Sequence, residues 1–372
     1  MVKFDNYLNV VPMELMEKIW LAIIAVFTFL ATFFITWFLS KFFLKKGIFG
    51  HDVHKADRPK VAEMGGVGLV TVMLVVTICC IFIFREDYWQ HFTVAALVIL
   101  VVGLIGIWDD LKALGAISKP FLLLIPAIPI LIWQTIENPA LLDNGLLLFD
   151  PKPYLPFIGQ VRITIIYWIL IPFAITVLSN ATNMLDVMNG STPITILPVA
   201  GVGIIATTLF YFKGLVTFPG LIMSILLFSC LLAFFWFNKY PARIFCGDTG
   251  SLTIGAIVAL IAIFGRIEII IIVAMMPHIM NSFQIINSVK GLRERREIKE
   301  RPTMIIKHKK EGKLEKVEIA ANPNEEAPLT YTRWLVAKQP LNEKEIVVSM
   351  GVVSLVSFIL ALITMGLIYI TI

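Results

Sequence analysis

The chain has 372 residues, of which 58% are hydrophobic and only 15% are charged, and its formal net charge is +5. A soluble domain of this length would carry about 25% charged residues, so the composition excludes a soluble globular protein. We therefore predict an all-α polytopic membrane protein. We expect no cleavable signal peptide and no disulfide framework, because three of the four cysteines lie inside apolar runs.

Apolar runs of membrane-spanning length predict about ten transmembrane helices. Pro126 and Pro129 interrupt the fourth run, and only three residues, from Arg266 to Glu268, separate the eighth run from the ninth. The expected spans are 18–44, 65–84, 92–108, 120–136, 163–182, 193–212, 215–237, 251–265, 267–288 and 346–370.

An even number of spans places both termini on one side of the membrane and the odd-numbered connections on the other. The odd-numbered connections, with Lys41 counted in the first of them, hold all but seven of the 31 Lys and Arg residues. Since positive charge stays in the cytoplasm, we expect the odd connections to be cytoplasmic and both termini to be outside. Without the long last loop the count is ten to seven, in the same direction. The odd connections are 45–64, 109–119, 183–192, 238–250 and 289–345.

Two connections have β-like patterns. In the external connection, apolar runs at 146–149 and 161–164 predict a β-hairpin or a re-entrant segment. In the long cytoplasmic loop 289–345, a turn candidate at 311–313 predicts a small β-hairpin. Its strands are expected at 302–307 and 314–320.

The first polar cluster runs from His51 to Lys60 and is followed by Glu63 and the pair Gly65-Gly66. It is either a solvated basic loop beside the membrane or an anion-binding mouth for a lipid or nucleotide phosphate. Close packing of helices would by itself explain the glycines.

The second cluster is a pair of adjacent carboxylates, Asp109 and Asp110, with Lys119 nine residues further on. The pair is either a hydrated loop start or a functional site, because carboxylates at a membrane boundary must be hydrated, paired or bound to a metal. On a turn the two side chains point in different directions. One can then face a metal or a proton while the other faces the protein frame, and Lys119 is a candidate phosphate ligand.

The third cluster ends the fifth span. Asn180, Asn183 and Asp186 are spaced three residues apart, which places them near one helix face and predicts a polar pocket. Gly190 is typical of a residue that ends a helix.

The fourth cluster, from Phe245 to Ser251, opens the eighth span. Asp248, Thr249 and Ser251 are all good helix N-caps, although one cap needs only one of them. A glycine-containing helix start also suits a phosphate, to which Asp248 would hold Mg²⁺.

The fifth cluster is the basic run from Arg293 to Arg301. It either lies on anionic lipid or forms an arginine clamp on a diphosphate. The span count places all five clusters on one face of the membrane. Such a site combines carboxylates and amides suited to Mg²⁺ (or Mn²⁺) with basic residues suited to phosphates, which is the equipment of phosphoryl transfer.

The order and spacing of three motifs resemble the polyprenyl-phosphate N-acetylhexosamine-1-phosphate transferases, from Lys41 to the last span. The motifs are Asp109-Asp110, Asn180-x-x-Asn183 through Asn189-Gly190, and Phe245-x-Gly247-Asp248-Thr249-Gly250-Ser251. The family includes the bacterial phospho-MurNAc-pentapeptide translocase and the archaeal and eukaryotic UDP-GlcNAc–dolichyl-phosphate GlcNAc-1-phosphate transferases. The resemblance implies ten spans, outside termini and a cytoplasmic Mg²⁺ site.

The resemblance also implies roles for the central polar residues. Asn183 and Asp248 would hold Mg²⁺. Asp109 and Asp110 would be the essential acidic pair near the acceptor phosphate, where Asp109 accepts a residual proton, orients the phosphate or attacks as a covalent nucleophile. Lys119 would meet a phosphate.

Further residues correspond to the family's nucleotide-sugar site. Phe245 would stack on uracil with Asn189 nearby, and Arg58 and Glu63 would lie in the loop that lines the site. The segment from Gly312 to Glu315 looks like a Gly-Lys-Leu-Glu segment of the eukaryotic enzymes. This register would make Arg301 the diphosphate arginine.

The implied function is transfer of GlcNAc-1-phosphate from UDP-GlcNAc to a polyprenyl (dolichyl) phosphate by one integral membrane domain, residues 1–372. The implied partners are these two substrates, membrane lipids and a second copy in a homodimer, without nucleic acid. The location would be the cell membrane, or the endoplasmic reticulum membrane in a eukaryote.

Two alternatives remain. One is a bacterial-type undecaprenyl-phosphate transferase that uses another UDP-HexNAc. The histidine-rich motif of that branch is absent from the last loop, where only His308 occurs, whereas Gly250-Ser251 is a bacterial feature. The other is a transporter, which predicts polar groups near mid-bilayer and a sequence repeat. Neither is visible here.

Overall fold

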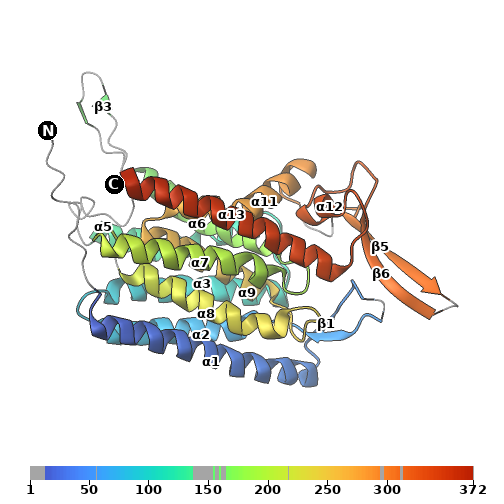
Figure 1. Cartoon of the computed structure of the whole chain (residues 1–372), viewed down its shortest axis with the longest axis horizontal. Helices are drawn as coiled ribbons and strands as arrows, with labels where there is room; N and C mark the ends of the chain where they lie inside the picture. Colours follow the sequence, from blue (N-terminus) through green and yellow to red (C-terminus); the bar gives the residue numbers. More distant parts are fainter. Residues whose placement is uncertain are drawn as a thin grey trace.

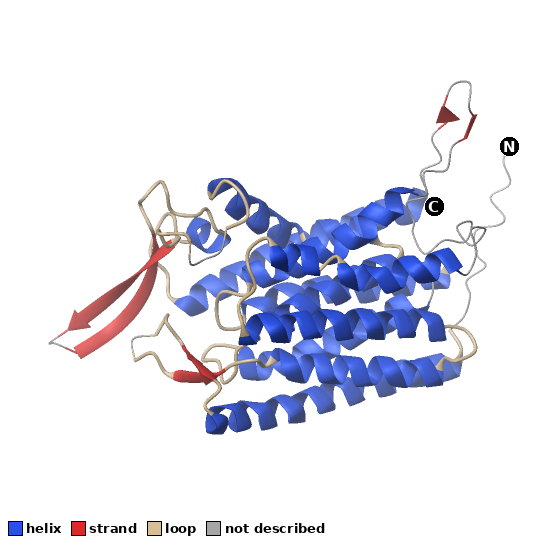
Figure 2. Ribbon diagram, turned by 180° about the vertical axis from the view of Figure 1, so that it is seen from behind, coloured by secondary structure: helices blue, strands red, loops and turns tan. Residues whose placement is uncertain are grey.

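The computed structural model describes residues 13–55, 57–136, 154–155, 159–160, 165–216, 218–293, 297–310 and 313–371. Long helices run side by side, and short strands lie beyond their ends (Figures 1 and 2). The helices are α1 (Leu15–Lys46), α2 (Gly66–Ile83), α3 (Trp89–Leu111), α4 (Ser118–Leu122), η1 (Ile125–Ala127), α5 (Ile128–Ile136), α6 (Ile165–Leu185), α7 (Ser191–Phe212), α8 (Phe218–Asn238), α9 (Gly247–Gly265), α10 (Glu268–Ala274), α11 (Met276–Ser288), α12 (Tyr331–Leu335) and α13 (Glu343–Thr371). The strands are β1 (Phe49–His51), β2 (Lys60–Ala62), β3 (Tyr154–Leu155), β4 (Gly159–Gln160), β5 (Thr303–Lys310) and β6 (Lys313–Ala321).

The described helices confirm an all-α polytopic membrane protein. Seven of them are long and apolar enough to cross a membrane, and the pair α10–α11, bent by 66°, makes an eighth candidate. Two shorter apolar stretches, Ser118–Trp133 and Ile169–Leu185, lie at the fourth and fifth expected spans. Each of the ten predicted ranges therefore overlaps a helix or a broken helix, while the number of membrane crossings stays a prediction.

Helix α9 is the centre of the bundle. It packs against α2, α3, α6 and α8, and 89% of the residues in its most apolar 18-residue stretch are buried. In the corresponding stretch of α1 only 22% of the residues are buried. The apolar outer face of α1 is therefore a surface for lipid. Because α9 is central, the residues of its first turn, among them Asp248, are surrounded by the neighbouring helices.

Close approach between backbones fixes α2 and α3 against the start of α9. A Cβ atom built on Gly66 would lie 2.0 Å from the Gly250 backbone nitrogen, and one on Gly106 would lie 2.4 Å from the Thr249 Cα. These contacts confirm that the Gly65-Gly66 pair permits close packing. They also place the end of α3 directly beside the first turn of α9.

We expect Gly66→Ala to destabilise the protein by at least about 2 kcal/mol, because the new methyl group meets backbone atoms that cannot rotate away. Gly366→Ala in α13 is the matched control, since nothing lies within 4 Å of the position that its methyl group would take. There alanine should stabilise the helix by roughly 1 kcal/mol. Thermal unfolding of both variants in detergent measures the contrast, and equal midpoints would contradict it.

The polar loops gather at one end of the bundle. The strand pair β1–β2 and the hairpin β5–β6 lie there, whereas α1 begins and α13 ends at the opposite end (Figure 1). The hairpin is antiparallel from Thr303↔Ala321 to Lys310↔Lys313, which confirms the predicted strands. The other predicted strands, 146–149 and 161–164, lie outside the described residues, and β3 pairs with β4 between them.

Candidate active site

Asp109 and Asp110 lie in the last turn of α3, which continues to Leu111 and so beyond the predicted span. The two residues are helical, not part of a turn as expected. Adjacent side chains on a helix still diverge by about 100°, so the two carboxylates point in different directions as predicted. Asp109 faces α4 and Asp110 faces the start of α9.

Asp110 caps α9 from outside. Its Oδ1 accepts a hydrogen bond from the Asp248 N–H at 2.7 Å, and its Oδ2 accepts from the Thr249 N–H at 3.0 Å and the Thr249 hydroxyl at 2.5 Å. The α9 N-cap residue, Cys246, provides no side-chain cap. The expectation of a local cap from Asp248, Thr249 or Ser251 is therefore wrong, because α3 supplies the anion. Both amides therefore already have a carboxylate partner, while the predicted phosphate site at this helix start stays a prediction.

Asp109 holds a lysine in place. Its Oδ2 lies 2.5 Å from the Lys119 Nζ on α4, and its Oδ1 accepts a hydrogen bond from the Leu114 N–H at 2.7 Å. Asp109 is only 6% exposed. A buried, doubly engaged carboxylate is not a hydrated loop start, so that alternative is excluded.

Lys119 joins three oxygen-bearing side chains. Besides Asp109, its Nζ donates to the Asn183 Oδ1 at 2.9 Å and lies 3.6 Å from the Asp248 Oδ2. The Asn183 amide in turn donates to Asp248 and, at 2.9 Å, to the Ser251 hydroxyl. We call Asp109, Lys119, Asn183 and Asp248 the central cluster; it brings together residues of α3, α4, α6 and α9.

The central cluster fits a hard divalent cation. Three oxygens converge on the Lys119 ammonium group, and carboxylate and amide oxygens are the kind of ligand that Mg²⁺ prefers. The Asp248 side chain is 35% exposed, against 4% for Asp109. An ion can therefore approach Asp248. The Asn183 side chain lies beside this carboxylate, with its NH₂ group facing Asp248 and its oxygen facing Lys119.

The predicted pocket of Asn180, Asn183 and Asp186 forms only in part. The Asn180 amide turns back to the Thr176 carbonyl of its own helix, whereas Asp186 accepts a hydrogen bond from the Thr192 hydroxyl at 2.7 Å. Burial raises the pKa of the Asp186 carboxyl to about 7 despite the Thr192 hydrogen bond, and the negative charge of Asp248 adds to the rise.

Gly190 does not end α6, which stops at Leu185. It adopts a left-handed φ of 86° and starts α7. Glycine meets this requirement at low cost because it has no Cβ.

Glu63 and Phe245 lie on two segments that run alongside each other. The Phe245 N–H donates to the Ala62 carbonyl at 2.8 Å, and the Gly65 N–H donates to the Phe245 carbonyl at 2.9 Å. Burial and then the negative charge of Asp110 raise the pKa of the Glu63 carboxyl. Glu63 therefore faces the same end of the bundle as the acidic pair, with the half-buried Phe245 ring beside the first turn of α9.

Arg58 and Arg301 stand apart from the central cluster. Both are exposed, and within the described ranges neither side chain bonds to any of the four cluster residues. The Arg301 carbonyl accepts a hydrogen bond from the Asn322 amide at 2.8 Å. Arg295, Arg296 and Gly312 lie outside the described residues, so the arginine clamp stays a prediction.

Asn189 belongs to a second polar group, which consists of Asp52, His54, Lys55, Asn189 and Glu343. The sequence assigned no individual role to Asp52, His54, Lys55 or Glu343. The Asn189 amide donates to the Asp52 Oδ2 at 2.8 Å, and its N–H donates to the Glu343 Oε1 at 3.0 Å. Lys55 lies 2.9 Å from the same Asp52 oxygen. Burial raises the pKa of Asp52, but the hydrogen bonds from Lys55 and Asn189 outweigh it and leave the pKa lowered.

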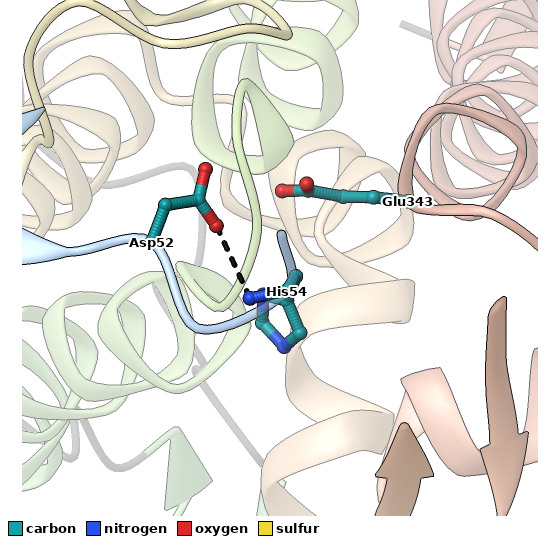
Figure 3. A group of neighbouring side chains, drawn as sticks. All are labelled: Asp52, His54 and Glu343. Carbon is teal, nitrogen blue, oxygen red and sulfur yellow. Dashed lines mark hydrogen bonds between the residues drawn. The ribbon is translucent and has the colours of Figure 1, made fainter. Parts of the chain in front are cut away.

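Asp52 and Glu343 face each other across this second group, with His54 below them (Figure 3). Glu343 is the first residue of α13, just before the predicted last span, and the sequence gives it no role. An acidic residue at the start of an apolar helix was the one signal for it, but that signal does not reveal a partner near residue 52.

The chain is similar to known proteins of one family. The profile described as Glycosyl transferase family 4 matches residues 92–266. A Saccharolobus solfataricus protein named as a candidate UDP-N-acetylglucosamine–dolichyl-phosphate N-acetylglucosaminephosphotransferase is 29% identical over 263 residues, which cover 68% of this chain and 74% of the relative.

Two further relatives come from an archaeon and a bacterium. A Methanocaldococcus jannaschii protein named as a candidate glycosyltransferase is 31% identical over 66% of this chain and 69% of its own length. The phospho-N-acetylmuramoyl-pentapeptide-transferase of Streptococcus thermophilus is 31% identical over 62% of this chain and 68% of its own length. The matched profile region, 92–266, contains all four residues of the central cluster.

Proposed function

The chain belongs to glycosyl transferase family 4, and we propose that it transfers GlcNAc-1-phosphate from UDP-GlcNAc to a polyprenyl (dolichyl) phosphate, with release of UMP. The observation that carries the proposal is the convergence of Asp109, Lys119, Asn183 and Asp248 at one end of an apolar helix bundle. A site at the end of membrane helices can meet a water-soluble nucleotide sugar and a lipid phosphate at the same time. The names of the archaeal relatives favour UDP-GlcNAc and dolichyl phosphate.

We propose that this chain binds the donor diphosphate beside the exposed side of Asp248. Asn183 and Asp248 would hold Mg²⁺, which would supply charge neutralisation on the diphosphate and on the departing UMP. Phe245 would contact the uracil ring, and Glu63 would line the sugar-nucleotide side of the site. Phosphoryl transfer depends mainly on positioning and charge neutralisation, and these residues are of the types that can provide both.

The acceptor would enter from the lipid. An oxygen of its phosphate attacks the phosphorus that carries GlcNAc, the bond from this phosphorus to the bridging oxygen breaks, and UMP leaves with the electron pair. The acceptor is already anionic, so it needs screening more than strong deprotonation. Lys119, held by Asp109, provides a fixed positive charge for it, and Asp109 accepts any remaining acceptor proton.

We place the site-bearing end of the bundle in the cytoplasm. The Lys and Arg count of the loops supports this orientation, because positive residues concentrate at the end where β1–β2 and β5–β6 lie. The protein itself is an integral membrane protein, as its apolar helices show.

Purified protein with Mg²⁺, labelled UDP-GlcNAc and a polyprenyl phosphate tests the proposal. UMP and a labelled diphospho-lipid should appear in equal amounts. A panel with UDP-GalNAc and UDP-MurNAc-pentapeptide decides between the archaeal and the bacterial type of donor. Absence of UMP release with every donor would refute the enzyme, and uptake of UDP-sugar into proteoliposomes without UMP release would establish a transporter instead.

Lys119→Met should lower the rate of UMP release by roughly 10²-fold or more, because the acceptor phosphate loses its positive partner and the buried Asp109 loses its counter-ion. Lys112→Met is the matched control: it removes a charge from an exposed lysine in the same connection and should change the rate only a few-fold. Initial rates at saturating substrate measure the difference. A rate in Lys119→Met equal to that of the control would exclude Lys119 from the reaction.

A further inference from the structure

The second polar group joins three segments that are distant in the sequence, one of which is the α6–α7 connection with Asn189. Asp52 and His54 lie in the loop between β1 and β2, and Glu343 begins α13. One ligand atom from each residue lies within 4.8 Å of the other two. The Glu343 side chain extends from α13 towards Asp52 and His54 (Figure 3).

One carboxylate oxygen in this group is buried without a partner. Glu343 is only 5% exposed; its Oε1 accepts the Asn189 N–H, whereas its Oε2 has no hydrogen-bond partner among the described residues. An unsatisfied oxygen of a buried carboxylate is strongly unfavourable, by more than the ~1–3 kcal/mol typical of a neutral group. A cation or a proton at this oxygen would therefore stabilise the arrangement.

The neighbouring charges do not supply it. Asp52, 2% exposed, is engaged by Lys55 at 2.9 Å, by the Asn189 amide at 2.8 Å and by the His54 N–H at 3.2 Å. The two buried carboxylates thus share Lys55, with the His54 imidazole beside them, and an excess of negative charge remains while this imidazole is neutral. A bound cation would remove this excess and engage the orphaned Glu343 oxygen.

The donor atoms indicate which class of cation fits. An imidazole nitrogen with two carboxylate oxygens is typical of Zn²⁺ and of first-row ions such as Mn²⁺ or Fe²⁺, whereas Mg²⁺ prefers oxygen ligands alone. The oxygen-only central cluster and this nitrogen-containing group would therefore select different ions.

We propose that Asp52, His54 and Glu343 form a second metal site, which binds a Zn²⁺-class divalent cation and ties the β1–β2 loop to the start of α13. Asn189 is bonded to both carboxylates, so the bound ion also fixes the connection between α6 and α7. The site is structural, and it does not depend on the transferase activity.

Co²⁺ is the probe, because a Co²⁺ ion with a histidine ligand gives a visible absorption band. The full-length protein in detergent is stripped with a chelator and titrated with Co²⁺ in excess Mg²⁺, which keeps the central cluster occupied. Wild type should show the band, and His54→Ala should lose it and bind Co²⁺ at least about tenfold more weakly. Zn²⁺ should displace Co²⁺ and raise the thermal midpoint of wild type but not of His54→Ala.

His51→Ala is the matched control, since His51 is exposed on the same loop and is not part of the group. It should bind Co²⁺ as wild type does. Glu343→Gln tests a second ligand; if it does not fold, His54→Ala decides alone, because it alters only a loop side chain. A band that survives in His54→Ala overturns the proposal. So does a wild type without any band, because Glu343 would then be satisfied by a proton.

Discussion

Asp248→Asn should reduce UMP release by at least roughly 10³-fold while leaving the fold intact. The amide has the same shape as the carboxylate, and Asp248 keeps its backbone bond to Asp110 in either case. The variant removes one negative charge from the most exposed member of the central cluster, where Mg²⁺ and the donor diphosphate would meet. Rates over a Mg²⁺ titration measure the effect, and excess Mg²⁺ should not restore the wild-type rate.

Asp87→Asn provides the control for this variant. Asp87 is exposed in the turn between α2 and α3, at the end of α3 opposite to the acidic pair, so the same chemical change should leave the rate within a few-fold of wild type. If Asp248→Asn also stayed within a few-fold, Asp248 would not be a metal ligand of the reaction. If it lost both rate and thermal midpoint, the loss would be one of folding.

Hydropathy predicted where the helices lie because the cost of exposing polar backbone in lipid acts on each segment independently. The broken fourth span is an example: Pro126 and Pro129 interrupt the apolar run, and the structure divides it into α4, η1 and α5. The bend between α10 and α11 was not predicted. It lies at Met275–Met276, directly before Pro277, inside a run that is apolar throughout.

The convergence of the central cluster followed from the sidedness of the loops, without any knowledge of contacts. An even number of spans was enough to bring Asp109, Asn183 and Asp248 to the same end. The sequence did not reveal that Asp110 bonds to the start of α9 and Asp109 to Lys119, since this depends on the angle at which α3 meets α9. Nor did it reveal the contact between Asn189 and Glu343, whose residues are 154 positions apart in the chain.

The two adjacent aspartates should behave differently when each is replaced. Asp110→Ala should lower the free energy of unfolding by roughly 2–4 kcal/mol, because it removes a helix cap and three hydrogen bonds to a charged acceptor. Asp110→Asn retains an acceptor oxygen and should fall between wild type and alanine. Thermal unfolding in detergent, followed by far-ultraviolet circular dichroism, gives this order.

Asp109→Asn should instead affect mainly the reaction. Lys119 keeps Asn183 and Asp248 as partners in this variant, so the thermal midpoint should fall less than in Asp110→Ala, while UMP release should fall by roughly 10²-fold or more. A phosphosugar–enzyme adduct trapped on wild type, and absent from Asp109→Asn, would show that Asp109 is a nucleophile and not a proton acceptor. Equal losses of stability in Asp109→Asn and Asp110→Ala would contradict the division, because only Asp110 bonds to the first turn of the central helix. The hydrogen bond from the Asp248 N–H to Asp110 fixes the position of Asp248, so the first turn of α9 depends on Asp110 for its structure and supplies Asp248 to the proposed reaction.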